Sequence, residues 1–385
     1  MPTFFSYDDL TWPEVEALPR ETPLVLPLGS GHDMQLLSSA LGNPPKIGVL
    51  PPLPFGWRGS GIEVPPILLG RYLGNLLTSL QQQGFTRTYA LTDLEKVPLL
   101  EPDTLLVQPR SAAPLEPLRF PVDADRGKVI LIPIGHTEQH GLHLPLSVDT
   151  IIIDAISRGT AESLPDKAFS LPVMPYGVST HRASFPGTLD TGGRSFEDFW
   201  VAVIDFLVGR GFDRFYLMSG HGGNVSFLVN AVKFAGERHR RIFCATAFLH
   251  TSGPLGAASL EKHRTSAIGG MGHACELETS LMLHLRPDLC HMDRVVDETD
   301  FISTPSYYMD WIEGGSLIAN PPWDDDTKTG AYGAGSQGDA QKGRIWLSVA
   351  IEEKAGHVLE IHEQQARREA RRNAGFGRWG ASPRP

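Results

Sequence analysis

Short apolar runs alternate along the chain with longer stretches in which apolar residues recur at every third or fourth position. Residues 23–28, 128–134 and 213–218 form such runs, whereas residues 66–83 and 196–209 show the helical spacing. Short apolar runs are typical of strands that are buried on both faces of a parallel sheet, with helices as the connections. The pattern therefore predicts an α/β fold with a mainly parallel sheet.

The order of these elements occurs twice. Residues 23–93 and residues 128–224 each contain a strand, a second strand, a helix that ends at a Gly-Phe pair, and a further strand. Gly84 and Gly211 end the two helices, because glycine easily takes the left-handed conformation that often follows a helix. The repeated order predicts an internal duplication of a strand–helix–strand unit.

The two copies differ in length and in their polar residues. A linker rich in proline and acidic residues covers residues 97–127, so we place a boundary near residue 115. We expect a shortened domain at residues 1–115 and a second domain at residues 116–385. After its first strand the second copy reads GHTEQHGLHLPLSVD, where the first copy reads GSGHDMQLLSS. The first copy is therefore expected to lack metal ligands.

Composition and charge exclude several classes of protein. The chain has 385 residues, of which 41% are hydrophobic and 20% are charged, as in ordinary globular proteins. The net charge of −10 argues against a nucleic-acid partner. The chain has three cysteines, which are too few for a disulfide framework and, as an odd number, cannot all pair. This cysteine content favours a cytoplasmic location. We expect neither a membrane span nor a signal peptide, because no apolar run is long enough.

Side chains that bind metals follow two strands of the second copy. Glu138 and His140 are two residues apart, so on an extended segment they point to the same side. Asp149 follows close enough to bridge two cations, and His221 comes after a later strand. Sites in α/β sheets form at the carboxyl ends of strands, so the four residues can meet in a site that suits Zn, Fe or Mn. A polar loop and a tight glycine turn remain the alternatives.

A third polar cluster, GGMGHACELETS, begins with glycines and continues as an apolar helix. His273 and Glu278 lie near the start of that helix, where the positive helix end favours a carboxylate. His273 is a proton-transfer candidate near neutral pH. The alternative is a helix cap, in which Glu276 and Glu278 offset the helix dipole.

Several segments carry a resemblance to known proteins. They read TWPEVEALPRETPLVLPLGS, IPIGHTEQHGLHLPLSVDT, SFPGTLD, SGHGGN and GHACELETS, with the glycine-rich GAYGAGSQGDAQKG behind them. Together they resemble the creatininase family of metal-dependent amidohydrolases. The resemblance implies a three-layer α/β/α fold in two tandem copies, and a centre of one or two divalent ions (Zn, Mn or Fe). It also implies a homo-oligomer, either a hexamer or a trimer in which the fused copy replaces one partner of each dimer.

The resemblance assigns the metal ligands residue by residue. It implies that Glu138, Asp149 and His221 hold one ion, and that His140 holds a second ion with Asp149 as the bridge. One departure stands at Gly223, where true creatininases carry a glutamate that binds the second metal. The departure puts the second ion and creatinine itself in doubt, and it resembles the deformylase and peptidase branches of the family.

The resemblance also implies a reaction. Metal-activated water would cleave a non-peptide C–N bond in a small-molecule amide, such as a cyclic amide or a formamide. His273 matches the family's catalytic histidine, and Glu278 matches an acid that supports the ligands or takes part in catalysis. The residues expected to contact the substrate are His181, Gly222, Gly223 and Asn224.

Two other functions remain open from the sequence. The chain could be a catalytically silent scaffold or binding protein, since its first copy has lost the site. The same metal centre could also open a ring or form an amide in a biosynthetic step. An assay of products separates these possibilities.

Overall fold

The computed structural model describes residues 2–108, 118–179, 184–249, 253–308, 310 and 314–375. In these residues the chain forms two parallel sheets, which confirms the predicted α/β class. The first sheet has the order β1-β3-β2-β4-β5 and the second the order β7-β6-β8-β9. The first sheet is built from β1 (Thr3–Ser6), β2 (Leu24–Pro27), β3 (Lys46–Val49), β4 (Thr88–Thr92) and β5 (Leu105–Val107). The second is built from β6 (Val129–Ile134), β7 (Ala168–Ser170), β8 (Arg214–Ser219) and β9 (Phe243–Phe248).

Both sheets share one arrangement of strands. The order β3-β2-β4-β5 in the first sheet corresponds, strand by strand along the chain, to β7-β6-β8-β9 in the second. An internal duplication predicts this agreement, and the duplication itself stays a prediction. The expected domain boundary near residue 115 lies outside the described residues.

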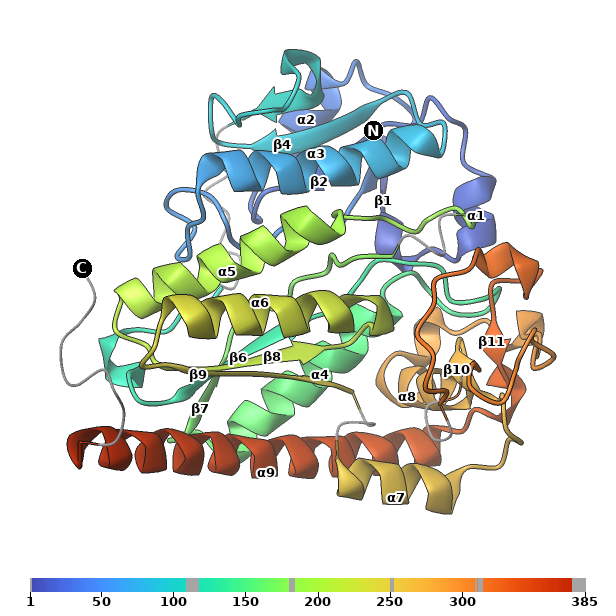
Figure 1. Ribbon diagram of the computed structural model, residues 1–385. Helices are drawn as coiled ribbons and strands as arrows, with labels where there is room; N and C mark the ends of the chain where they lie inside the picture. Colours follow the sequence, from blue (N-terminus) through green and yellow to red (C-terminus); the bar gives the residue numbers. More distant parts are fainter. Residues whose placement is uncertain are drawn as a thin grey trace.

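The helices form layers on both faces of the sheets (Figure 1). Helices α3 (Pro66–Gln82), α5 (Gly193–Gly209) and α6 (Val225–Arg238) lie between the two sheets. The far face of the second sheet is covered by α4 (Val148–Ser163) and α9 (Ala340–Asn373), and α8 (Glu276–Leu285) packs against these two helices. The remaining helices and the small antiparallel pair are α1 (Trp12–Glu16), α2 (Met34–Ala40), α7 (Pro254–His263), β10 (Met271–His273) and β11 (Tyr332–Gly333). Within the described residues, no helix has both the length and the apolar character that a membrane crossing needs.

One continuous core joins the two sheets. Ile130, Ile132 and Ile134 of β6 face this core, while the alternate residues of the strand face α4 and α9. Tyr72 of α3 packs against Phe199 of α5 with their ring centroids 4.5 Å apart. The helices between the sheets and the facing sides of both sheets therefore form one hydrophobic interior.

The predicted ends of α3 and α5 are confirmed. Gly84 and Gly211 follow the two helices with φ of 91° each, a conformation that costs glycine little. The backbone N–H of Phe85 then donates to Leu80, which closes the last turn of α3. The glycine signal in the sequence thus located both helix ends.

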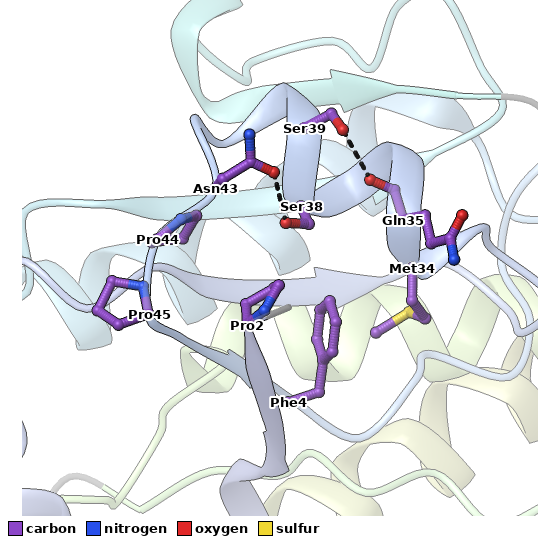
Figure 2. Close-up of a pocket in the computed structure, with 9 residues that line it drawn as sticks. All are labelled: Pro2, Phe4, Met34, Gln35, Ser38, Ser39, Asn43, Pro44 and Pro45. Atoms are coloured by element: carbon purple, nitrogen blue, oxygen red, sulfur yellow. Dashed lines mark hydrogen bonds between the residues drawn. The ribbon is translucent and has the colours of Figure 1, made fainter.

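The outer face of the first sheet carries an open hollow of about 700 Å³ beside α2. Figure 2 shows Phe4 and Met34 next to it, with three proline rings at its rim. Its lining contains no histidine, acid or cysteine. The hollow therefore has none of the side chains from which a catalytic metal site is built.

Lys354 lies on the buried face of α9, and its burial predicts a pH-dependent stability. Its Nζ donates to the carbonyl of Leu249 at 2.6 Å, and the side chain is fully buried. Burial lowers the pKa of Lys354 to about 8, although the nearby Glu353 acts in the opposite direction.

Between this pKa and that of an exposed lysine, the unfolded chain binds more protons than the folded chain, so the free energy of unfolding rises with pH. We expect the free energy of unfolding of the wild type, minus that of Lys354→Met, to rise by roughly 3 kcal/mol between pH 7 and pH 10.5. Chemical denaturation at each pH measures both values. A difference that stays flat over this range would contradict the assignment.

Candidate metal centre

The four predicted ligands meet at the carboxyl edge of the second sheet. Glu138 and His140 lie in the loop between β6 and α4, and Asp149 is in the first turn of α4. His221 lies two residues after Ser219, where β8 ends. All four side chains are at most 3% exposed. The expectation that both loops converge at the strand ends is therefore met by the geometry.

Asp149 has the geometry of a bridging carboxylate. Its Oδ1 lies 3.3 Å from His140 Nε2, and its Oδ2 lies 3.1 Å from His221 Nδ1. Glu138 Oε1 lies on the His221 side of Asp149, 3.0 Å from the same Nδ1 atom of His221. The two oxygens of one carboxylate thus face two different imidazoles, which is the arrangement that a pair of cations requires.

Glu278 joins the His140 side of the centre. Its Oε1 is 3.8 Å from His140 Nε2, and His140, Asp149 and Glu278 offer ligand atoms that lie within 4.8 Å of one another. Its Oε2 accepts from the backbone N–H of Cys275 at the start of α8, so the expected helix cap is present as well. The sequence suggested a supporting or catalytic acid, whereas this geometry makes Glu278 a possible ligand.

Gly223 cannot carry a side chain in this structure. A Cβ atom there would lie 2.3 Å from the Val178 carbonyl oxygen and 2.4 Å from His221 Nε2. A glutamate at this position would therefore break the contact between those two groups. The acid of Glu278 lies where it can supply a third ligand next to His140 and Asp149.

Backbone carbonyls fix the orientation of both imidazoles. His221 Nε2 donates to Val178 O at 2.9 Å, and His140 Nδ1 donates to Glu138 O at 3.1 Å. A carbonyl can only accept, so in the neutral form that binds a metal the lone pairs lie on His221 Nδ1 and His140 Nε2, which face the carboxylates. His140 Nε2 and Asp149 Oδ2 are among the buried side-chain atoms of the described residues that have no hydrogen-bond partner. Two such acceptors on neighbouring side chains fit a metal site.

His136 is a residue of the site that the sequence analysis did not single out. Its Nδ1 accepts from the backbone N–H of Gly177 at 2.9 Å, so its Nε2 carries the hydrogen. That Nε2 lies 4.0 Å from Glu138 Oε2, and Ser179 Oγ donates to the same oxygen at 3.0 Å. His136, Glu138 and His221 offer ligand atoms within 4.8 Å of one another, but the hydrogen on Nε2 makes His136 a poor metal ligand in this orientation. Its place in GHTEQHG, two residues before Glu138, is the signal that could have found it.

His273 faces the centre from β10. Its Nε2 donates to Gln139 O at 2.7 Å, and its Nδ1 lies 3.9 Å from Glu138 Oε1. Its ring lies 4.2 Å from that of His140, and Trp323 packs edge-on against it at 5.5 Å. Trp323, which the sequence analysis also missed, covers this side of the site and is only 4% exposed.

The carboxylates make the centre attract positive charge. Burial alone would lower the pKa of His140, but Asp149 and Glu278 outweigh it and raise the pKa to about 9. At His143, which lies outside the carboxylate pair, burial lowers the pKa to about 4. The contrast between two buried histidines shows where negative charge is concentrated.

The predicted substrate contacts are placed only in part. His181 lies outside the described residues, and Gly222 begins a short 3₁₀ turn, η4 (Gly222–Asn224). The Asn224 amide accepts from the Val178 N–H at 3.0 Å and donates to Gly135 O at 3.2 Å. Asn224 thus holds the turn beside the ligands, and contact of these residues with a substrate stays a prediction.

Comparison with known proteins gives related sequences over part of the chain. A creatinine amidohydrolase of Pseudomonas putida is 28% identical over 252 residues, which cover 60% of this chain and 89% of that protein. A mycofactocin precursor peptide peptidase of Mycobacterium ulcerans (strain Agy99) is 33% identical over 177 residues. That match covers 43% of this chain and spans 62% of the length of the peptidase.

Solved structures show the same fold. A manganese form of creatininase aligns at 25% identity with a TM-score of 0.50, over 61% of this chain and 91% of that one. A Zn–Zn form of a creatininase variant aligns at 25% identity with a TM-score of 0.50, over 61% and 90%. The family model described as creatinine amidohydrolase matches residues 120–358. The chain therefore belongs to the creatininase family.

Proposed function

We propose that this protein is a metal-dependent amidohydrolase that cleaves a non-peptide C–N bond in a small molecule. The observation that carries the proposal is the carboxylate of Asp149, whose two oxygens face His140 and His221 in separate ligand groups. The manganese and zinc forms among the structural relatives support the same assignment.

Two places for divalent ions follow from the side chains. Glu138, Asp149 and His221 would hold the first ion, and His140, Asp149 and Glu278 would hold the second. Imidazole with carboxylate is a donor set that suits Zn, Mn or Fe. When bound, such ions supply Lewis-acid activation of water and of a carbonyl group.

The chain's own residues would hold the metal ligands in place, exclude water and transfer a proton. Since Nε2–H of His273 is held by Gln139 O, its Nδ1 is the atom that can take a proton and return it to a leaving nitrogen. Ser179 donates to the second oxygen of Glu138 at 3.0 Å, which keeps the first oxygen on the ligand side. Trp323 keeps bulk water from the ring of His273.

The proposed substrate is a cyclic amide or a formamide. The relatives act on different amides, as their names state, so the family alone does not choose one. Gly223 leaves the turn after β8 without an acid, in contrast to the pattern of true creatininases. Creatinine is therefore a weak substrate in this proposal. We propose a homo-oligomer, and a duplication supported by the shared strand order.

A product assay tests the reaction class. Protein loaded with Mn or Zn would be incubated with formamides, cyclic amides and short peptides, with detection of products by mass spectrometry. Release of formate or of a ring-opened acid supports the proposal. Protein that holds two ions and converts none of these compounds would overturn it in favour of an amide-forming enzyme or a silent scaffold.

Replacement of Glu278 by glutamine tests the second ion. We expect Glu278→Gln to bind one equivalent of metal less than the wild type, because a neutral amide is a poor ligand for these cations. The matched control is Glu276→Gln in the same helix turn, whose carboxylate accepts from Thr265 and Ser266 and pairs with Lys342. Elemental analysis that finds equal metal in Glu278→Gln and wild type would remove Glu278 from the ligand set.

A further inference from the structure

Helix α3 of the first sheet presents a row of polar side chains to the second domain. Asn75 and Ser79 of α3 and Gln83, the C-cap residue directly after it, are spaced four residues apart, so they lie on the same side of the helix. All three make hydrogen bonds with the backbone of residues 187–191. We call residues 187–191 the strap.

Gln83 holds one end of the strap with both atoms of its amide. Its Nε2 donates to Thr188 O at 2.8 Å, and its Oε1 accepts from Gly187 N at 2.7 Å. Gly187 has φ of 93°, a conformation that leaves the strap outside any regular ladder. A side-chain amide therefore satisfies backbone groups that a strand or a helix would otherwise pair.

Asn75 and Ser79 hold the other end. Asn75 Nδ2 donates to Thr191 O at 2.6 Å, and Ser79 Oγ accepts from Asp190 N at 3.0 Å. The polar face of α3 thus covers the whole length of the strap.

The opposite side of the strap lies against the ligand loop. Leu189 N donates to Thr137 O at 3.1 Å, and Gln139 N donates to Thr188 Oγ1 at 3.2 Å. Thr137 and Gln139 flank Glu138 in the sequence, and the carbonyl of Gln139 accepts from His273. Thr188, which accepts from Gln83, is therefore hydrogen-bonded directly to the backbone between Glu138 and His140.

A second contact from α3 reaches the histidine side of the centre. Tyr72 OH donates to Tyr176 O at 2.9 Å, and both side chains are fully buried. Two residues after Tyr176, the carbonyl of Val178 accepts from His221 and fixes its ring. The same helix thus contacts both segments that orient the ligands.

We propose that α3 is a positioning element of the metal centre, and that Gln83 is its main positioning residue through the strap. In this account the copy without ligands sets the geometry of the copy that has them. The inference rests on the proposed metal centre and goes beyond it. It assigns Gln83 an effect on metal geometry, which a contact that only joins the two sheets would not have.

The test compares two glutamines at the end of α3. Gln83→Met keeps the length of the side chain and removes both hydrogen bonds to the strap. Gln81→Met is the matched control, because Gln81 Nε2 donates to Thr88 Oγ1 within the first sheet. For each protein we would measure metal release to a chromogenic chelator and the visible spectrum of the Co(II) form. We expect affinity about 10-fold to 100-fold weaker in Gln83→Met, with altered Co(II) bands, and wild-type values in Gln81→Met.

The outcomes separate this inference from the proposed function. Wild-type affinity and spectrum in Gln83→Met would overturn the inference alone, and so would equal losses in both variants. A wild type that binds no metal would overturn the proposed function together with the inference. If Gln83→Met fails to fold, Asn75→Ala takes its place, with the same expected direction and the same contradicting result.

Discussion

Asp149→Asn is expected to prevent the binding of both metal ions and to abolish turnover. The wild-type carboxylate has one oxygen 3.3 Å from His140 and the other 3.1 Å from His221, so its replacement removes a ligand from each ion at once. Saturating metal stabilises a protein that binds it only when folded, by about 2.7 kcal/mol at 100 times the dissociation constant. Thermal unfolding with and without Mn should therefore show a rise in Tm for the wild type and none for the variant.

A control from the same helix separates loss of metal from loss of fold. Asp154 of α4 is half-buried and pairs with Arg158 at 3.6 Å, away from the ligands. Asp154→Asn should keep the metal-dependent rise in Tm. A normal rise in Asp149→Asn would show that this carboxylate does not bridge the ions.

His273→Asn is expected to lower kcat by about 100-fold to 10,000-fold and to leave the metal content unchanged. The imidazole is held by Gln139 O through Nε2, so Nδ1 remains as the atom that transfers protons. Asparagine keeps a donor for that carbonyl and has no group that titrates near neutral pH. Steady-state kinetics with the substrate found in the product assay, beside elemental analysis, measures both quantities.

His284, an exposed histidine of α8, provides the control for this variant. His284→Asn should retain wild-type kcat and metal content. Loss of metal in His273→Asn would show that His273 is a metal ligand. It would contradict the assignment of His273 as the residue that transfers a proton.

The local pattern predicted the fold well because strands and helices follow from short-range signals. The buried run at β6 and the glycines after α3 and α5 place these elements without any tertiary information. The meeting of the candidate ligands that follow strands was also predictable, since the ends of parallel strands meet at one edge. Glu138, His140 and His221 belong to this group.

Other parts of the site depend on contacts that sequence spacing cannot show. The place of Glu278 beside His140 results from packing of α8 against the loop after β6, more than a hundred residues away in the chain. The tautomer of His136 is set by the backbone of Gly177. The strap is held by Gln83, which directly follows α3. Such long-range hydrogen bonds are fixed by the whole fold and leave no periodic signal.

Metal content tests the central claim most directly. Protein purified without chelator would be measured by elemental analysis beside a double variant, Glu138→Ala with His140→Ala. The account predicts one to two equivalents of Zn, Mn or Fe in the wild type and a loss of metal in the variant. A wild type without metal, which also takes up none when metal is added, would contradict the account and favour a silent scaffold.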